Sequence, residues 1–369
     1  MKILVTGAKG FVGKNLVAQL KNEGIIDIYE YDVDTNTEML DKFTTDCEFI
    51  FHLAGVNRPQ SEEEFKKGNF GFTSQLLDLL KKNNNKSHIL LSSSIQAELD
   101  NPYGQSKKAG EELMMTYSQE TNSKVFLYRL PNVFGKWCRP NYNSVVATFC
   151  NNIANNLPIK INDPDVILKL VYIDDVVGEF ISALKGMDNK PSGYCSVDQF
   201  YEIKLGEIVE QLYSFKESRN DKSIPDMSNG FTKKLYSTYL SYLPKDKFSY
   251  PLKMNVDNRG SFTEFVKTAD RGQVSINISK PGITKGNHWH HTKNEKFLVV
   301  SGKGVIKFRQ IHSNEIIEYY VSGEKLEVID IPTGYTHNII NLGETDMITV
   351  MWANERFDPE NPDTFFLEV

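Results

Sequence analysis

Ser94, Tyr103 and Lys107 carry side chains that could together protonate a carbonyl oxygen during its reduction. Reducing a ketone needs a hydride donor and an acid for the developing alkoxide. Tyrosine alone is a poor acid near neutrality, because its pKa is about 10. Lys107 follows Tyr103 by four positions, one helical turn, so we expect it to stabilise the phenolate and lower that pKa. A Tyr-x-x-x-Lys pair alone is more often just one face of a helix.

A second group of reactive side chains lies in the segment HWHHTKNE. His288 and His290 are two positions apart, so on a strand both point to one face while His291 points to the other. Glu295 and the more distant His337 would come from neighbouring strands and complete a set of metal ligands. Such a set suits Zn, Fe, Mn or Ni; we expect one divalent metal, with Zn preferred. The alternative is a polar strand that happens to be rich in histidine.

A glycine-rich turn lies between an apolar run and a helical pattern, in the segment TGAKGFVG. Glycine allows a tight turn and a close approach of the backbone to a pyrophosphate at the positive end of a helix. Nineteen positions after Gly13 stands Asp32, where an acid would bind a ribose 2′-hydroxyl and favour NAD. The nearby Asp34 leaves the 2′-position open. The predicted dinucleotide site comprises Gly7, Gly10, Phe11, Val12, Gly13 and Asp32.

Two regions of different periodicity must position these groups. Up to about residue 200, short apolar runs alternate with helical patterns, which predicts an α/β fold with a doubly wound parallel sheet. After about residue 250, short strands separated by Gly, Pro and Asn turns predict an all-β barrel or sandwich. The change falls within YLPKDKFSYPL, so we predict domains at residues 1–245 and 246–369.

Composition narrows the class of protein. A length of 369 residues favours two domains, and 40% hydrophobic and 24% charged residues are usual for a globular protein. The net charge of −6 argues against a nucleic-acid partner. Four cysteines lack CxxC spacing, and neither a signal peptide nor a long apolar segment is evident. We therefore expect a cytoplasmic protein without a membrane span.

The first part of the chain, roughly residues 1–240, resembles the extended short-chain dehydrogenase/reductase family. Five ordered motifs carry the resemblance: the GxxGxxG turn, FHLAG, LLSSSIQ with YGQSK, RLPNVFG and LVYIDDVV. The resemblance implies that Ser94, Tyr103 and Lys107 are catalytic. It also implies a nicotinamide cofactor bound by the glycine turn, Tyr103, Lys107, and Leu53, Ala54 and Gly55 of FHLAG. Only eight residues separate Ser94 from Tyr103, fewer than is usual in that family, so the geometry of the substrate pocket is not implied.

The second part resembles the cupin superfamily of small jelly-roll barrels. The motif G-x5-H-x-H-x4-E-x6-G runs from Gly282 to Gly302, and P-x-G-x2-H-x3-N runs from Pro332 to Asn341. Only the leading glycine of the second motif is displaced, with Gly323 the nearest. The resemblance implies a metal held by His288, His290, Glu295 and His337.

A competing resemblance concerns the base for a proton transfer. VDNRGSFTEF is similar to the entry segment of metal-free deoxysugar epimerases, which are also cupin barrels. Their catalytic histidine aligns with His288, and their usual glutamine is replaced by His290. If His288 binds a metal, another group must act as base, or the metal is structural. Tyr335, Lys296 and His312 are ionisable candidates, each more often structural or on the surface.

The order of the two parts resembles the family of bifunctional capsular-polysaccharide enzymes of the CapF type, over essentially the whole chain. That resemblance implies C3 epimerisation of a UDP-linked 4-keto-6-deoxy sugar in the barrel, then NADPH-dependent C4 reduction in the first domain. Asp32 favours NADH instead, so both cofactors stay open. The alternatives are a single-function 4-ketoreductase with a structural or dimerising barrel, and a barrel that senses a sugar without chemistry. A homodimer through the barrel is expected in either case.

Overall fold

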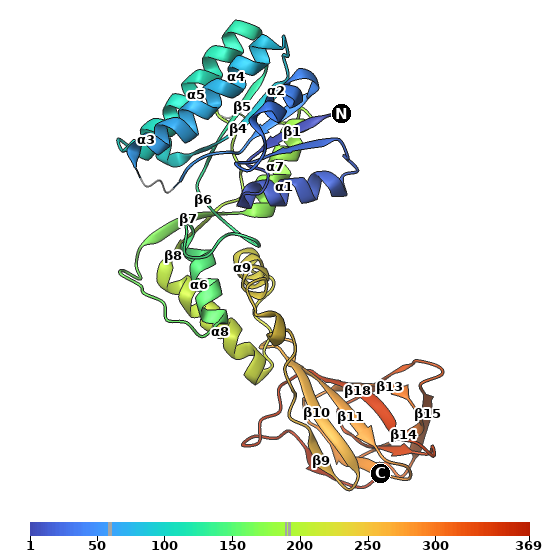
Figure 1. The fold of residues 1–369 in the computed structure, drawn as a ribbon. Helices are drawn as coiled ribbons and strands as arrows, with labels where there is room; N and C mark the ends of the chain where they lie inside the picture. Colours follow the sequence, from blue (N-terminus) through green and yellow to red (C-terminus); the bar gives the residue numbers. More distant parts are fainter. Residues whose placement is uncertain (58–60, 189, 191–192) are drawn as a thin grey trace. The chain divides into compact units, whose positions relative to one another are not determined.

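The computed structural model of the chain describes residues 1–57, 61–188, 190 and 193–369 (Figure 1). Tertiary contacts divide it into two compact units, Met1–Tyr213 with Asn229–Pro244, and Ser214–Ser228 with Lys245–Val369. The short segment 214–228 thus groups with the second unit. A boundary at the single point between residues 245 and 246 stays a prediction.

The first unit is built on a parallel sheet with the strand order β2-β1-β3-β4-β5. Every neighbouring pair in it is parallel, so helical crossovers must connect the strands. β1 and β3 are fully buried and β5 nearly so, which suits their β-branched and aromatic residues, whereas the edge strand β2 is largely half-buried. Their bounds are β1 Ile3–Thr6, β2 Ile28–Tyr31, β3 Phe49–His52, β4 His88–Ser94 and β5 Val125–Leu130. The predicted doubly wound α/β fold is confirmed.

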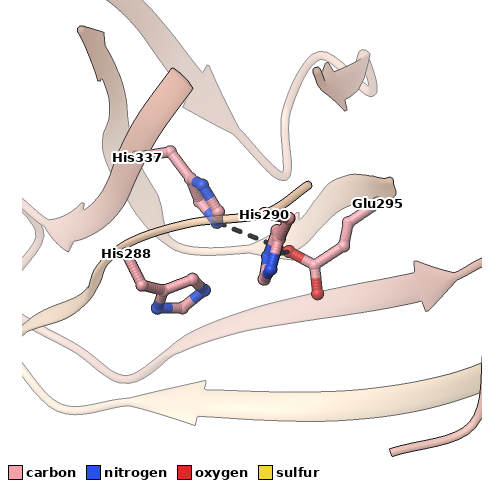
Figure 2. Close-up of side chains that lie close together, drawn as sticks. All are labelled: His288, His290, Glu295 and His337. Carbon is pink, nitrogen blue, oxygen red and sulfur yellow. Dashed lines mark hydrogen bonds and ion pairs between the residues drawn. The ribbon is translucent and has the colours of Figure 1, made fainter. Parts of the chain in front are cut away.

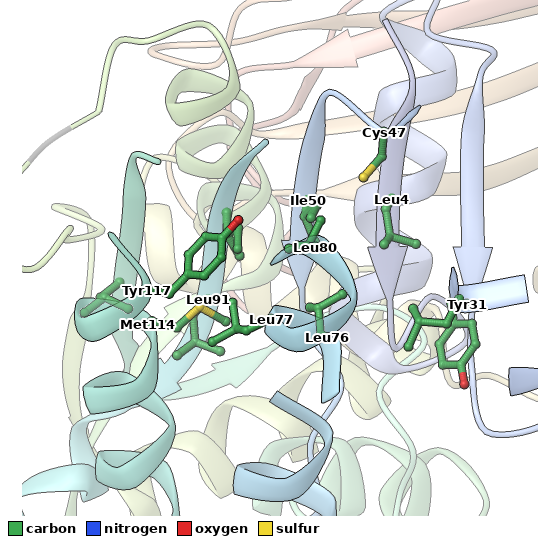
Figure 3. Packing of buried hydrophobic residues seen from close by; sticks show 13 residues of the cluster. Leu4, Tyr31, Cys47, Ile50, Leu76, Leu77, Leu80, Leu91, Met114 and Tyr117 are labelled. Carbon is green, nitrogen blue, oxygen red and sulfur yellow. The ribbon is translucent and has the colours of Figure 1, made fainter. Parts of the chain in front are cut away.

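Helices cover both faces of this sheet. On one face, Leu4 and Ile50 pack against Leu76 of one helix and Met114 of another in one buried cluster (Figure 3). On the other face, Phe180 lies 6.2 Å from Phe51 and 5.1 Å from Tyr128, measured between ring centroids. In chain order the α-helices of the protein, of which α8 runs from the first unit into the second, are α1 Phe11–Asn22, α2 Thr37–Asp46, α3 Glu62–Phe65, α4 Phe72–Lys82, α5 Pro102–Thr121, α6 Val145–Ala154, α7 Ile173–Leu184, α8 Leu205–Asp221 and α9 Gly230–Leu240.

The start of α5 fixes the place of Tyr103 and Lys107. Asn101 caps the helix by accepting a hydrogen bond from the Gly104 amide at 2.8 Å, and Pro102 occupies the first turn, where its lack of an N–H costs nothing. A second, three-stranded sheet of this unit has the order β6-β7-β8, with β6 Asn132–Phe134, β7 Ile167–Tyr172 and β8 Tyr201–Lys204.

The second unit is an antiparallel barrel made of two sheets, ordered β16-β13-β18-β11-β10-β9 and β15-β14-β17-β12-β19. This is the predicted all-β cupin jelly roll. The strands are β9 Asn255–Asp257, β10 Gly260–Lys267, β11 Gln273–Ser279, β12 Thr284–Trp289, β13 Glu295–Ser301, β14 Lys303–Gln310, β15 Ile316–Ser322, β16 Val328–Ile331, β17 Tyr335–Asn341, β18 Met347–Ala353 and β19 Phe365–Phe366.

The interior of the barrel is apolar on one side and polar on the other. Phe297, Ile306, Phe308 and Ile339 belong to its apolar cluster. On β11 the usual alternation is reversed, because the buried residues are polar and Val274, Ile276 and Ile278 between them are partly exposed. The buried polar residues of this strand are Gln273, Ser275, Asn277 and Ser279.

A β-bulge interrupts β12 just before the histidines. The pairing register with β17 shifts between Gly286 and His288, and Asn287 lies between them with a φ of 62°. Gly286 has a φ of 106°, and a Cβ there would stand 2.8 Å from the carbonyl oxygen of His337. The bulge lets Lys285 and His288, three positions apart, line the same cavity.

Candidate functional site

The glycine turn of the first unit packs directly against the end of β3. Gly7 has a φ of 70°, and a Cβ on it would stand 2.8 Å from the Ala54 amide nitrogen. A Cβ on Gly13 would stand 2.1 Å from the Gly7 carbonyl oxygen. No side chain caps the start of α1 at Gly10, so the first amides of the helix are available to an anion. The turn, with Phe11 and Val12 opening α1, therefore has the form that a pyrophosphate needs.

Asp32 lies at the carboxyl end of β2, beside this turn. Its carboxylate accepts hydrogen bonds from the Lys9 amide at 2.7 Å and the Val33 amide at 2.8 Å. The Lys9 ammonium forms an ion pair with Asp34. The hydrogen bond from Lys9 thus joins the glycine turn to Asp32, the predicted ribose-binding acid, and the Lys9 ammonium adds a positive charge beside them.

Ser94 and Tyr103 are brought together at the carboxyl end of β4. The Tyr103 hydroxyl donates to Asn57 Oδ1 at 3.0 Å. Burial raises the pKa of Tyr103, and a hydrogen bond with Ser94 opposes that rise. Ser94, and not Lys107, is the group that opposes the rise here, so the stabilisation of a phenolate by Lys107 stays a prediction.

Lys107 is itself the perturbed group. Its ammonium donates to the Ser92 carbonyl at 3.3 Å and lies 6.0 Å from the centre of the Tyr103 ring. Burial lowers the pKa of Lys107 to about 8, against an opposing effect of Glu111. A Cβ on Gly55 would stand 3.0 Å from Lys107 Nζ, so the segment Leu53–Gly55 borders the lysine as well as the glycine turn.

The buried carboxylate of Glu111, one helical turn after Lys107 on α5, was not predicted from the sequence. Glu111 is 1% exposed, accepts from the Ser93 hydroxyl, and pairs with Arg129 at 2.6 Å. The Arg129 guanidinium also donates to the Tyr194 hydroxyl at 2.9 Å. This network joins α5, β4 and β5 near the carboxyl ends of the two strands. The one signal in the sequence was an acid four positions after Lys107.

In the barrel, four side chains from three strands converge on one point (Figure 2). One nitrogen or oxygen atom of each of His288, His290, Glu295 and His337 lies within 4.8 Å of the others. His288 comes from β12 and His290 follows it, Glu295 opens β13, and His337 lies on β17. Nε2 of His290 and Nε2 of His337 are each 3.4 Å from Glu295 Oε2. The structure brings together all four predicted ligands.

The chemistry of this cluster fits a bound cation. His337 is 1% exposed; its Nδ1 has no hydrogen-bond partner among the described residues, and its Nε2 faces the Glu295 carboxylate at 3.4 Å. Burial, then the neighbouring His337 and His290, lowers the pKa of His288 to about 4, so its imidazole is neutral. Burial would raise the pKa of Glu295, but the contacts of its carboxylate with His290 and His337 lower it overall. Neutral imidazoles around one carboxylate are ligands that suit Zn.

The remaining candidates lie apart from the cluster. The His291 ring packs against Trp289 and Phe365, at centroid distances of 4.5 and 4.9 Å, away from the other histidines. Lys296 is exposed and pairs with Asp330. His312 is exposed in the turn after β14, and Tyr335 packs against the apolar cluster. None of the proposed bases Tyr335, Lys296 and His312 lines the cavity described next.

A cavity of about 550 Å³ opens beside the cluster. Lys285 lines it and was missed by the sequence reasoning, because strand alternation without the bulge points it away from His288. Its ammonium donates to Asn277 Oδ1 at 2.8 Å, to the Ile278 carbonyl at 2.8 Å and to the Ser261 carbonyl at 3.4 Å. Burial lowers the pKa of Lys285. Other polar residues on the cavity wall are Asp257, Arg259, Glu264, Gln273, Ser275 and Lys293.

The fold and the first site define a dinucleotide-binding protein of the short-chain dehydrogenase/reductase class, extended by a cupin barrel. The chain belongs to the NAD dependent epimerase/dehydratase family, whose model matches residues 3–195, and it therefore uses a nicotinamide cofactor. Residues 255–365 match the polysaccharide biosynthesis C-terminal domain. Among the described residues, no helix is both long and apolar enough to cross a bilayer.

Full-length relatives are similar to the chain in both parts. UDP-2-acetamido-2,6-beta-L-arabino-hexul-4-ose reductase of Pseudomonas aeruginosa is 48% identical over 371 residues, which cover 100% of this chain and 99% of the relative. The crystal structure of the capsular polysaccharide assembling protein CapF from Staphylococcus aureus has a TM-score of 0.96 at 60% identity, covering 100% of both chains. CapF with the inhibitor 3-isopropenyl-tropolone matches at a TM-score of 0.91 and 56% identity, also over 100% of both chains. The resemblance to CapF-type enzymes is confirmed.

Proposed function

We propose that the chain is a bifunctional enzyme of capsule precursor synthesis. The barrel epimerises C3 of a UDP-2-acetamido-2,6-dideoxy-4-hexulose, and the first unit then reduces C4 to give UDP-N-acetyl-L-talosamine, on the route to UDP-N-acetyl-L-fucosamine. The observation that carries the proposal is the placement of Ser94, Tyr103 and Lys107 beside the glycine turn, in a chain 48% identical over its whole length to a UDP-sugar 4-ketone reductase.

In the reduction, a bound nicotinamide supplies the hydride for C4. The Tyr103 hydroxyl donates its proton to the oxygen at C4, and the Ser94 hydroxyl holds that oxygen by a hydrogen bond. The positive charge of Lys107 stabilises the phenolate that remains. Because burial alone raises the pKa of Tyr103, its acidity in the reaction depends on this charge and on Ser94.

NADPH is the proposed cofactor, with NADH as the alternative. Asp32 is already engaged by the Lys9 and Val33 amides, so its carboxylate has fewer lone pairs for a ribose hydroxyl. The Lys9 ammonium, paired with Asp34, supplies a positive group for a 2′-phosphate at this edge.

In the epimerisation, the protons beside the C4 ketone are acidic because the carbanion is delocalised as an enolate. One divalent metal, preferably Zn, would be held by His288, His290, Glu295 and His337 and would polarise an oxygen of the substrate. Lys285 presents an ammonium group on the wall of the same cavity, where it would stabilise negative charge on the enolate oxygen. The polar inner face of β11 suits the hydroxyl and acetamido groups of a sugar.

The alternative is a single-function reductase whose barrel is structural, dimerising or sugar-sensing. The full chain without nicotinamide separates the two functions, because reduction then cannot occur. Incubation of the 4-keto sugar in D2O should place deuterium at C3, seen by NMR. If deuterium does not enter, the epimerase proposal is wrong, and NADPH oxidation on the C3-inverted sugar would still test the reductase.

We also propose that the chain works as a homodimer in the cytoplasm. The outward side of β11 carries the partly exposed Val274, Ile276 and Ile278, and the edge strand β15 exposes Ile316 and Tyr320. Light scattering of the purified protein tests the dimer.

A further inference from the structure

The last residues of the chain lie along the strand that carries the histidines. β19 pairs antiparallel with β12, so that Phe366 is opposite His288. The Leu367 amide donates to the Asn287 carbonyl at 3.0 Å. Thr336, which precedes His337 on β17, donates a hydrogen bond from its hydroxyl to the Leu367 carbonyl. This C-terminal tail, residues 361–369, therefore contacts two of the strands that carry the four-residue cluster.

Asp363 makes the most concentrated contact of the tail. Its carboxylate accepts hydrogen bonds from three consecutive amides, those of His291 at 2.9 Å, Thr292 at 2.7 Å and Lys293 at 2.9 Å. The Thr292 hydroxyl adds a fourth bond at 3.1 Å. Burial would raise the pKa of Asp363, but these bonds lower it overall, so the carboxylate is charged and each bond is strengthened. The three amides belong to the loop between His290 and Glu295.

The backbone of the same residue reaches His290 itself. The Asp363 carbonyl is in hydrogen-bond contact with Nδ1 of His290, and a carbonyl oxygen can only accept, so Nδ1 carries the proton. Nε2, the nitrogen that lies 3.4 Å from Glu295 Oε2, is then the one that would bind a metal. A hydrogen bond of this kind selects the tautomer and the ring orientation that a metal requires.

We propose that Asp363 is a positioning residue that preforms the metal site from the far end of the chain. Its carbonyl orients His290, and its carboxylate holds the loop His291–Lys293 in the shape that places Glu295 opposite that ring. The inference rests on the metal site proposed above. It goes further because Asp363 is not one of the four ligands and lies 73 positions from His290 in the sequence. We infer that this residue sets the affinity of the site for the metal.

A second contact holds the other end of the loop and limits what Asp363 alone controls. The Asn294 amide donates to Asn354 Oδ1 at 3.2 Å, and the Asn354 amide donates to the Asn294 carbonyl at 3.1 Å. Glu295 at the start of β13 is thus also held from β18. Removing the Asp363 carboxylate should therefore loosen residues 291–293 and leave the barrel folded.

The test compares Asp363→Ala with Asp358→Ala in the full chain. Asp358 lies in the segment just before the tail, is exposed, and has a carboxylate that accepts from the Glu360 amide, so it matches the charge change without touching the loop. Zinc affinity is measured by competition with a chromophoric chelator, and hydrogen exchange of the segment 288–295 is measured without metal. We expect Asp363→Ala to weaken zinc binding about 10- to 100-fold, as loss of such supporting groups does elsewhere, and to speed exchange at residues 291–293. Asp358→Ala should change neither.

The possible failures are distinguishable. Wild-type affinity and exchange in Asp363→Ala would overturn the role of Asp363 and leave the proposed metal site standing. Wild-type protein that binds no zinc would overturn the metal site and the inference with it. If Asp363→Ala does not fold, Asp363→Asn takes its place, because asparagine keeps the size of the side chain but not its charge. This variant should show the same changes in smaller degree, and unchanged values would contradict the proposal.

Discussion

Gly55 and Lys107 lie against each other, so that a Cβ on the glycine would stand 3.0 Å from the lysine Nζ. The same space is shared by Asn69 Oδ1, also 3.0 Å from that position, which leaves the ammonium little room to move. Gly55→Ala should shift the ammonium and lower kcat/KM for reduction by roughly 10- to 100-fold, because small displacements of a catalytic group are costly. The Gly178→Ala variant is the control, since nothing lies within 4 Å of its Cβ position and its φ is not positive. Steady-state NADPH oxidation checks both.

Tyr103→Phe should remove the proton donor and leave the barrel unaffected. We expect kcat for NADPH oxidation to fall about 10²- to 10⁴-fold, the usual contribution of a general acid. Deuterium exchange at C3 in the same preparation should match the wild type. Tyr213→Phe, a partly exposed tyrosine of the same unit, serves as the control. Loss of both activities in Tyr103→Phe would contradict the division of labour between the two parts.

The pKa of Lys107 predicts how the reductase responds to pH. Burial lowers it from 10.5 to about 8, so the stabilising positive charge is present below about pH 8 and is lost above it. We expect kcat/KM for reduction to fall as pH rises through this value, and Lys107→Arg, which stays charged, to flatten the decline. The free energy of unfolding should change in the opposite sense. Between about pH 8 and pH 10.5 Lys107 is protonated in the unfolded chain but not in the folded one, so its contribution to the free energy of unfolding rises with pH. A rate that is constant from pH 7 to 9.5 would contradict this role for Lys107.

Lys285→Met should reduce C3 exchange and spare NADPH oxidation on a substrate that needs no epimerisation. The methionine keeps much of the side-chain volume but removes the ammonium from the cavity, so the enolate loses a stabilising charge. A decrease of about 10²-fold or more is expected for a group that acts on the developing charge. Lys280→Met, at an exposed position just after β11, is the matched control. Equal exchange in both variants would exclude Lys285 from the reaction.

His337→Ala should lower the metal content of the purified protein. His337 is buried, its Nδ1 has no hydrogen-bond partner among the described residues and its Nε2 faces Glu295 Oε2 at 3.4 Å, so the role of a metal ligand suits this ring. Elemental analysis should find about one divalent ion per wild-type chain and much less in His337→Ala. His312→Ala, which changes an exposed histidine outside the cluster, should retain the metal. Equal metal content in all three proteins would show that the ion is held elsewhere.

Features set by near neighbours in the sequence were predictable. The glycine turn, Asp32, the Tyr103–Lys107 pair and the switch from helical to strand periodicity are all local patterns, since each depends on residues within about one crossover unit. The four-residue cluster spans a longer range, but its spacing follows from strand alternation and a known barrel motif. These parts of the fold agree with the structure.

Features set by distant contacts were not predictable. The bulge at Gly286 places Lys285 in the cavity, and no periodic rule contains it. The pairing of Glu111 with Arg129 joins two elements whose contact exists only after the sheet forms. Asp363 meets its loop across about seventy positions. In each case the partner is chosen by tertiary packing, so a single sequence offers no signal stronger than the residue type.

The reversed alternation on β11 assigns two tasks, packing the two sheets together and lining a cavity, to different side chains of the barrel. The apolar contacts between the two sheets come from residues of β13, β14 and β17, whereas Gln273, Ser275 and Asn277 face a cavity and take no part in that apolar cluster. Substitutions of Gln273 or Ser275 would thus reshape the cavity that the proposed sugar would occupy and remove no contact from the apolar cluster. The cavity wall and the apolar core of this barrel can change independently along the sequence.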